Sequence, residues 1–468
     1  MLKTLKRLLS RKSKQESQSK ESGLAKLRRG AYDMATDSPR KGAVYVSTAS
    51  EDRELLPWER QTAISNVRNL RRNFPLVDFV IEKHCQYNAV FSMQPLTSDR
   101  EFNRLLTRKL AEWKHRKNCD ITGRYSFDEM MNLAVSHAVS DGDVGIVYHD
   151  GGKLQLIESE RIRNPDDEPL NSEHWTHGVK TGKYRVSYYC IHKRRLTGGF
   201  EQERIIPADN LWLPGFRKRI DQLRGVSPFS PSVDTFQHIY ECCEFALAKV
   251  KLEQFIGLVH KVDDDALKKY RDAIEKDMEE KYGQGIANFT IGHQDSVDML
   301  TANNPSNQFQ DFIETMIRMA FACLGLPLSF WKGSDTNYYG SEGECEQYID
   351  WCQKRQVQWL EMLTEITRRL IADWVLNDEL ELPKGWKVED VEFEWLGASI
   401  PWFRLVKNIK DFVTSIQGGF MNPQDVCKMF SLDYIDNAEQ IRDAKALNKE
   451  IGITPLWEQE QIAVNFGA

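Results

Sequence analysis

The sequence lacks several features that would place it in a common functional class. It contains no apolar run near 18 residues, the length that a transmembrane helix requires, so we expect no membrane span. It has no Walker A motif, no GxGxxG after a predicted strand and no GxSxG nucleophile motif. These absences leave the sequence without a strong enzymatic signature.

Cysteine pairing and a strong positive charge are also missing. The nine cysteines are an odd number without a CxxC pair, and Cys242 and Cys243 are adjacent, which hinders a bridge between them. We therefore expect reduced thiols, as in a cytosol, rather than a disulfide framework. The formal net charge of −6 argues against a surface that is wholly a nucleic-acid footprint. At 468 residues the chain is long enough for two or more modules.

The first 30 residues are rich in lysine, arginine and serine, and no long apolar segment follows them. A secretory signal is therefore not expected. We interpret residues 1–30 as a basic, flexible tail, and a tail that contacts DNA or an assembly partner is the alternative.

Residues 50–225 combine helical and strand patterns, which predicts a mixed α+β module. Hydrophobic spacing predicts helices over 51–87, with a break at Pro75, over 104–117 and over 127–139. Asp141-Gly142-Asp143 is a turn signal. Strands are predicted at 144–149, 154–157, 184–192 and 210–213, with Gly151-Gly152 as a hairpin turn.

Two long helices flank a small insert in the middle of the chain. The first is predicted from Pro231 to Val259 and the second over 307–324. The insert is predicted to hold a charged helix over 265–282 and strands at 289–291 and 297–300. Gly325 and Pro327 end the second helix, and an aromatic loop follows it. This region is either an ordinary buried helical hairpin or a hairpin that presents a functional loop.

The remaining residues are predicted to be mostly helical. A long helix is expected over 342–376 and a strand over 391–396. After Pro401, helical segments are divided by Gly418-Gly419 and by Asn422-Pro423.

Candidate metal chemistry is sparse. His174 and His177 offer two imidazoles, but no cysteine or carboxylate cluster stands near them at a zinc spacing. Asp141 and Asp143 resemble the paired carboxylates of a metal-dependent nuclease, although a DGD sequence is commoner as a plain turn. The acidic run 263–265 favours capping of the following helix over calcium binding. We therefore expect no metal and no cofactor.

Several stretches occur in an order that resembles the lambda-type portal proteins of tailed bacteriophages, from about residue 60 to about residue 450. The carriers of this resemblance are Arg68 to Asn73 (RNLRRN), the series Trp113, Cys119-Asp120, Gly123, Phe127 and Asp141-Gly142, the segment Leu156 to Ile162 (LIESERI), Gln222 to Val226 (QLRGV), Phe309 to Pro327 with its LGLP end, and Asn337-Tyr338. The chain departs from the family pattern at Tyr339-Gly340, where the family continues toward an arginine, and at 404–408, where it has RLVKN.

The resemblance implies a portal fold of the α+β class, assembled as a ring. Such a fold has an α/β wing, long stem helices, a small α/β clip and a helical C-terminal crown. The chain then divides into a basic tail 1–30, wing 31–228, stem helix 229–258, clip 259–305, stem helix 306–325, tunnel loop 326–341, long helix and wing return 342–400, and crown 401–468.

The resemblance also implies a function, that of a head-tail connector. A dodecameric ring would stand at one capsid vertex of a virion assembled in the host cytoplasm. Through it a terminase motor would package double-stranded DNA, which would later be ejected. The implied partners are other copies of the chain, DNA, the terminase, the major capsid and scaffolding proteins, and head-completion or tail-connector proteins, with no membrane.

Two sets of site residues follow from the resemblance. The tunnel loop would face DNA with Phe330, Trp331, Lys332, Asn337, Tyr338 and Tyr339, and the clip would meet the motor with Lys268, Lys269 and Arg271. The alternative for the loop is that its aromatic side chains pack into the junction of wing and stem. The competing classes of protein are another ring or scaffold component of a virion, and a DNA-acting enzyme that uses Asp141 and Asp143.

Overall fold

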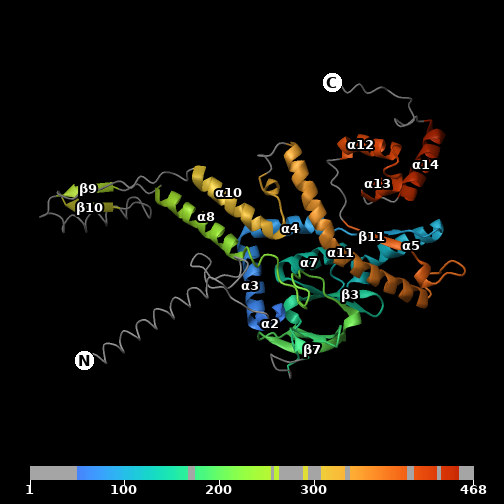
Figure 1. The fold of residues 1–468 in the computed structure, drawn as a ribbon, viewed down its shortest axis with the longest axis horizontal. Helices are drawn as coiled ribbons and strands as arrows, with labels where there is room; N and C mark the ends of the chain where they lie inside the picture. The colour runs from blue at the N-terminus through green and yellow to red at the C-terminus, as the bar shows by residue number, and fades with distance from the viewer. Residues whose placement is uncertain are drawn as a thin grey trace, which may run out of the picture. The chain divides into compact units, whose positions relative to one another are not determined.

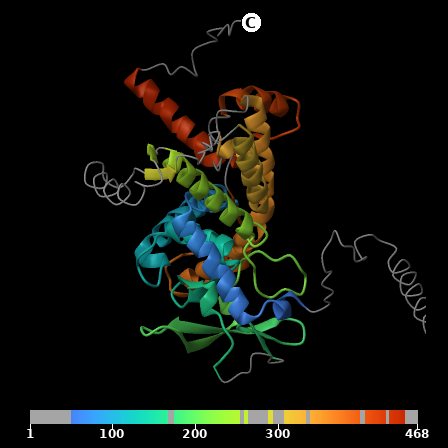
Figure 2. The same cartoon turned by 90° about the vertical axis from the view of Figure 1, so that its left-hand side faces the viewer.

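The computed structural model describes residues 50–166, 174–253, 258–262, 288–292, 307–332, 338–397, 405–429 and 434–452 (Figure 1, Figure 2). The chain divides into two compact units, residues 1–54 and 55–468. In the first unit, the described residues form the short helix α2 (Glu51–Glu54). Every other element belongs to the second unit, whose mixture of helices and sheets confirms the α+β class.

The main hydrophobic core lies between four helices: α3 (Pro57–Asn73), α4 (Pro75–Asn88), α7 (Phe127–Asp141) and α11 (Tyr338–Leu376) (Figure 1). Val77, Ile81, Met131 and Leu363 are fully buried in it. Pro75 has no amide hydrogen and suits the first position of a helix, so α4 begins at this residue, just after α3 has ended at Asn73. The predicted break at Pro75 is confirmed.

Capping residues set the ends of the next helices. Asp99 accepts a hydrogen bond from the Phe102 amide (3.1 Å), so α5 (Arg100–Trp113) begins four residues earlier than predicted. His115 is extended and separates α5 from the short helix α6 (Arg116–Cys119), so the predicted single helix over 104–117 is wrong. Ser126 forms a capping box with Glu129 at the start of α7, the helix predicted over 127–139.

Two antiparallel sheets follow α7. The first has the order β3 (Lys153–Glu158), β2 (Val144–His149) and β8 (Leu211–Trp212), and the predicted Gly151-Gly152 turn joins its first two strands. The second has the order β4 (Trp175–Thr176), β5 (Val179–Thr181), β6 (Val186–Arg194) and β7 (Phe200–Pro207). Of the second sheet, only β6 was predicted. A second hydrophobic cluster, which includes Ile157 and Ile191, packs between the two sheets. The 3-10 turns η2 (Ser159–Arg161) and η3 (Ala208–Asn210) follow β3 and β7.

Two strands that are far apart in the sequence pair with each other next to helices α5 and α11. β1 (Ser92–Pro95) pairs antiparallel with β11 (Phe393–Leu396), which follows the turn η6 (Val388–Asp390). Met93 lies opposite Trp395, and the Trp395 indole donates a hydrogen bond to the Thr367 hydroxyl of α11 (2.9 Å). The predicted strand over 391–396 is thus confirmed, and its partner is a strand that local pattern did not reveal.

The two central helices pack on each other as α8 (Val233–Glu253) and α10 (Asn307–Phe321) (Figure 1). The first predicted helix, drawn as far as 258 or 259, is too long, because β9 (Leu258–Val262) is a strand parallel to β10 (Asn288–Gly292). β-branched Val259 and Val262 favour this strand. The predicted helix over 265–282 and strand at 297–300 lie outside the described residues.

The C-terminal part is helical, as predicted. It contains α12 (Leu405–Gln417), α13 (Pro423–Met429) and α14 (Tyr434–Ile451). Gly419 takes a positive φ of 76° after α12, and Asn422 accepts a hydrogen bond from the Asp425 amide (2.8 Å) to begin α13. Both predicted divisions are therefore confirmed.

Candidate functional site

The segment after α10 begins with a sharp turn at Gly325. Its φ of 64° is left-handed, and the Leu326 amide donates to the Phe321 carbonyl (3.2 Å) after the short 3-10 turn η4 (Ala322–Leu324). A Cβ at Gly325 would lie 3.3 Å from the indole nitrogen of Trp351 in α11. Glycine therefore allows the chain to turn close against α11 and enter the 3-10 turn η5 (Leu328–Phe330).

Two of the predicted loop aromatics pack on helices. The Phe330 ring stacks on Tyr87 of α4, with centroids 5.6 Å apart, and meets the Tyr348 ring of α11 edge-on at 5.4 Å. The Trp331 ring meets Phe79 edge-on at 5.3 Å but stays 47% exposed. Phe330 thus anchors the segment between α4 and α11, whereas Trp331 keeps about half of its surface available.

Lys332 forms an ion pair with Glu314 of α10. Its Nζ lies 2.5 Å from Glu314 Oε1, and the two side chains are 38% and 34% exposed. The pair ties the end of the described segment to the middle of α10 and leaves both charges in contact with solvent.

The predicted loop is shorter than drawn. α11 begins at Tyr338, so the loop ends at 337 rather than at 341, and Tyr338 and Tyr339 belong to the first turn of this helix. A helix can begin before Gly340 and Gly343 because the long run that follows stabilises it cooperatively. Asn337 lies outside the described residues, as do Lys268, Lys269 and Arg271 of the predicted motor-docking set.

A buried ion cluster elsewhere in the fold joins several of the sequence motifs. Asp143 accepts two hydrogen bonds from Arg224, at 2.8 and 2.9 Å, and one from the Gly225 amide at 2.7 Å. Arg60 of α3 lies 3.2 Å from the same carboxylate, and Ser159 donates to it at 2.5 Å. The side chains of Asp143 and Arg224 are 0% and 1% exposed, so solvent does not screen this pair.

Asp141, the last residue of α7, forms a second ion pair. Arg68 donates to both of its carboxylate oxygens, at 2.9 and 2.7 Å, and His137 lies 3.0 Å away. Arg68 also reaches Glu160 at 3.1 Å. The turn residue between the two aspartates, Gly142, has a φ of 101°, a conformation that glycine adopts readily.

The surroundings keep both carboxylates ionised. Burial by itself would raise the pKa of Asp143, but the charges of Arg224 and Arg60 outweigh this effect and hold its pKa well below the usual value. At Asp141, burial would likewise raise the pKa, but hydrogen bonds from His137 and Arg68 outweigh it and lower the pKa. Each carboxylate is thus neutralised by arginine.

This arrangement argues against the nuclease alternative. A divalent metal needs carboxylate oxygens that are free to coordinate it, and here arginine donors occupy those of Asp141 and Asp143. Within the described residues, no three histidine, cysteine, aspartate or glutamate side chains gather as a metal site. His177 lies at a turn with a φ of 50°, and its carbonyl accepts a hydrogen bond from Arg224 (2.6 Å).

Sequence reasoning identified the motifs but not their contacts. Arg60 carried no motif, and nothing local indicated that Arg224 would pair with Asp143 across 81 residues. The available signal was a turn with two aspartates beside apolar segments, together with arginines in three separate motifs. Acids and bases among apolar residues are rarely buried unless they pair with each other.

Comparison with known protein families identifies the family of this chain. A family model described as "Phage portal protein, lambda family" matches residues 37–338. The match covers more than half of the chain, and the chain belongs to the lambda family of phage portal proteins.

Individual relatives are more distant. A "Probable portal protein" of Halomonas phage phiHAP-1 is 30% identical over 157 residues, and the match spans 31% of this chain and 30% of that relative. Among solved structures, a chain in the virion of a native gene transfer agent particle has a TM-score of 0.43 and 12% identity, covering 80% of this chain and 98% of that one. A chain in the neck of the native particle, computed with C12 symmetry, has a TM-score of 0.43 and 13% identity with the same coverage.

Proposed function

We propose that this chain is a portal protein that assembles into a ring at one capsid vertex of a virion, with twelve copies as its family implies. The observation that carries this proposal is the match of residues 37–338 to the lambda portal family. The ring would form the head-tail channel through which DNA enters during packaging and leaves during ejection. The role is structural, without a catalytic site or cofactor of its own.

The helices α8 and α10 are the proposed wall of the channel, as stem helices. They pack on each other and present large apolar side chains that are more than half exposed: Phe245, Leu247, Phe312 and Met319. Covering such side chains with a neighbouring copy would remove apolar area from water and stabilise an assembly. The exposed apolar surface thus supports contacts between copies.

The loop from 326 to 337 is the proposed tunnel loop, with Phe330 as its anchor. Lys332 is the residue we assign to phosphate contact, and Trp331, Asn337, Tyr338 and Tyr339 lie next to it in sequence. Phosphate contacts carry no base information, so such a loop would grip any DNA sequence. A net charge of −6 fits a conduit, because each phosphate that a protein neutralises adds affinity and would slow passage.

Each proposed partner is assigned to one of the proposed domains. The segment 259–305 is the proposed clip for the terminase motor and later for head-completion proteins. It includes all of β9 but its first residue, all of β10, and the cations Lys268, Lys269 and Arg271. Capsid and scaffolding proteins would surround the wing, in a particle assembled in the host cytoplasm. None of the helices in the described ranges is long and apolar enough to cross a bilayer.

Electron microscopy and native mass measurement of the purified full chain test the proposal. We expect closed rings with a central channel and a mass near twelve copies. Monomers and dimers alone, at every salt concentration, would contradict the portal role. Ring-shaped particles that occur elsewhere than at a unique vertex of virions would favour the alternative, another ring or scaffold component.

A further inference from the structure

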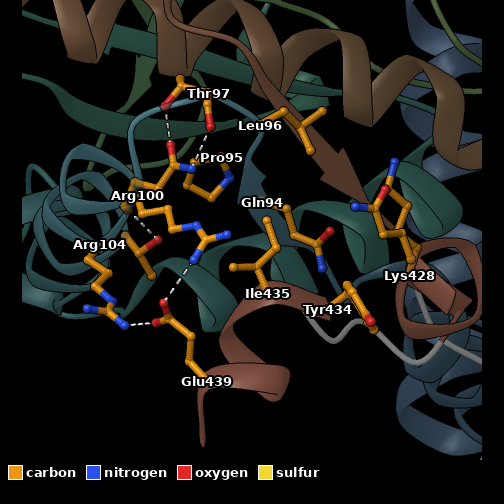
Figure 3. A pocket seen from close by; sticks show the side chains of 13 residues that line it. Gln94, Pro95, Leu96, Thr97, Arg100, Arg104, Lys428, Tyr434, Ile435 and Glu439 are labelled. Atoms are coloured by element: carbon orange, nitrogen blue, oxygen red, sulfur yellow. Dashed lines mark hydrogen bonds and ion pairs between the residues drawn. The ribbon is translucent and has the colours of Figure 1, made fainter. Parts of the chain in front are cut away.

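The C-terminal helix α14 closes a polar cavity on the surface formed by β1 and α5 (Figure 3). The cavity has a volume of about 230 Å³. Gln94 of β1 lies at its centre, Arg100 and Arg104 of α5 lie on one side, and Tyr434, Ile435 and Glu439 of α14 lie across from them (Figure 3).

Glu439 makes a polar contact between α14 and this surface. Its carboxylate pairs with Arg104 and, at 3.5 Å, with Arg100 (Figure 3). The two arginine side chains are 55% and 64% exposed, whereas that of Glu439 is only 14% exposed. Ion pairs with exposed partners contribute little net free energy and weaken as salt screens them.

The side chain of Gln94 destabilises the docking of α14 on this surface. It is 6% exposed, and its side-chain Nε2 is buried without a hydrogen-bond acceptor. Figure 3 shows this carboxamide beside Tyr434 and Ile435 of α14. A buried donor without an acceptor is destabilising because it has lost its water. Movement of α14 away from β1 would return water to this group.

Apolar burial does little to hold α14 in place. None of the α14 side chains that the structure describes is fully buried. Ile441, Leu447 and Ile451 remain 45%, 57% and 58% exposed. Since apolar burial is the dominant favourable term in packing, its small extent here gives polar groups such as Glu439 and Gln94 more weight in holding or releasing α14.

We propose that α14 is a releasable strap, held on α5 by Glu439 and opposed by the buried carboxamide of Gln94. Its release frees Arg100 and Arg104 from Glu439 and exposes Gln94 to water, while the core around α4, α7 and α11 stays folded. The proposal concerns the single chain and does not depend on the assignment as a portal.

Hydrogen–deuterium exchange of the full-length protein tests the strap. From about 0.01 M to about 1 M salt the Debye length falls from about 30 Å to about 3 Å, and exchange of the α14 amides should become faster. Glu439→Gln should accelerate this exchange about 2- to 10-fold at low salt and remove most of its salt dependence. Gln94→Met, which keeps the length but removes the donor, should slow it about 5-fold or more.

Two internal comparisons make the result decisive. Asp443→Asn alters a carboxylate on the same helix that pairs only with its neighbour Arg442 among the contacts of the described residues, and it should leave α14 exchange unchanged. Amides of α7, in the core, should exchange at the wild-type rate in every variant, which shows that the fold is intact. Unchanged α14 exchange in Glu439→Gln overturns the proposal, as does exchange in Gln94→Met that equals or exceeds the wild-type rate.

Discussion

Arg224 and Asp143 form a two-pronged ion pair in which neither side chain is more than 1% exposed. The same guanidinium also donates to the carbonyls of Ser159, Ile162 and His177. One side chain therefore ties the end of α7, the turn after β3 and the start of the second sheet to the segment that leads into α8. Through Arg224, the QLRGV motif fastens the end of the mixed module to its turns and strands.

Removal of Arg224 should be strongly destabilising. Arg224→Met keeps most of the volume but leaves Asp143 with Arg60 as its remaining cation, and breaking a buried pair typically costs about 3–5 kcal/mol. The urea midpoint, followed by tryptophan fluorescence, should fall accordingly. Arg442→Met, at a side chain that is 66% exposed, is the matched control and should change stability by about 0.5 kcal/mol or less. Equal midpoints for the two variants would show that the buried pair contributes nothing.

Gly225 should tolerate no side chain. A Cβ at this position would overlap the carbonyl oxygen of Gly142, so Gly225→Ala should destabilise the protein by about 1–3 kcal/mol or more. Gly343→Ala in α11 provides the comparison, since a Cβ there meets nothing within 4 Å. That change should stabilise the helix by up to about 1 kcal/mol. Thermal unfolding of both variants measures the difference, and a Gly225→Ala protein as stable as wild type would refute the steric argument.

His84 should make stability depend on pH in the mildly acidic range. Burial, reinforced by the charge of Arg355, lowers the pKa of His84 to about 3, whereas an unfolded histidine titrates near about 6.5. Below that value the unfolded chain binds one more proton than the folded chain, so stability falls as pH falls toward 3, by about 1.4 kcal/mol per pH unit. The difference in free energy of unfolding between wild type and His84→Gln, measured by urea unfolding, should be smaller at pH 5 than at pH 7. A constant difference across that range would mean that His84 is not held neutral.

The loop prediction concerns Lys332 and rests on the proposed portal role. Lys332→Ala, and separately a loop shortened between Ser334 and Asn337, should still form rings because α8 and α10 are unchanged. Packaged particles should retain less full-length DNA, since each variant loses a phosphate contact or the segment that presents it. Lys354→Ala, at a lysine of α11 that pairs with Asp350 and is 75% exposed, is the control. Normal packaging and retention in both loop variants would leave the loop without a gripping role.

The clip prediction concerns Lys268, Lys269 and Arg271. Reversal of these three charges should leave rings intact and weaken docking of the terminase motor, because steering between charged surfaces depends on complementary sign. Binding of purified rings to the motor, with packaging as a second readout, measures the effect. Motor binding at the wild-type level would remove these residues from the interface.

Much of the local structure follows directly from the sequence. Helices such as α7 and strands such as β2 were predictable because their hydrophobic period and their capping residues lie within a few positions of each other. Pro75, Gly325 and Gly419 marked element ends for the same reason, since each acts on its own backbone. The motif order was sufficient to indicate the portal family, which the match over residues 37–338 then established.

Only the tertiary structure decided which distant residues meet. β1 is a four-residue segment that ends in proline, and it becomes a strand because β11, about 300 residues later, supplies its hydrogen-bond partners. The pairing of Asp143 with Arg224 and the seat of Phe330 between Tyr87 and Tyr348 arise in the same way. Such contacts depend on how elements pack, and burial turns ordinary acids, bases and aromatic rings into paired or stacked groups that no local pattern encodes.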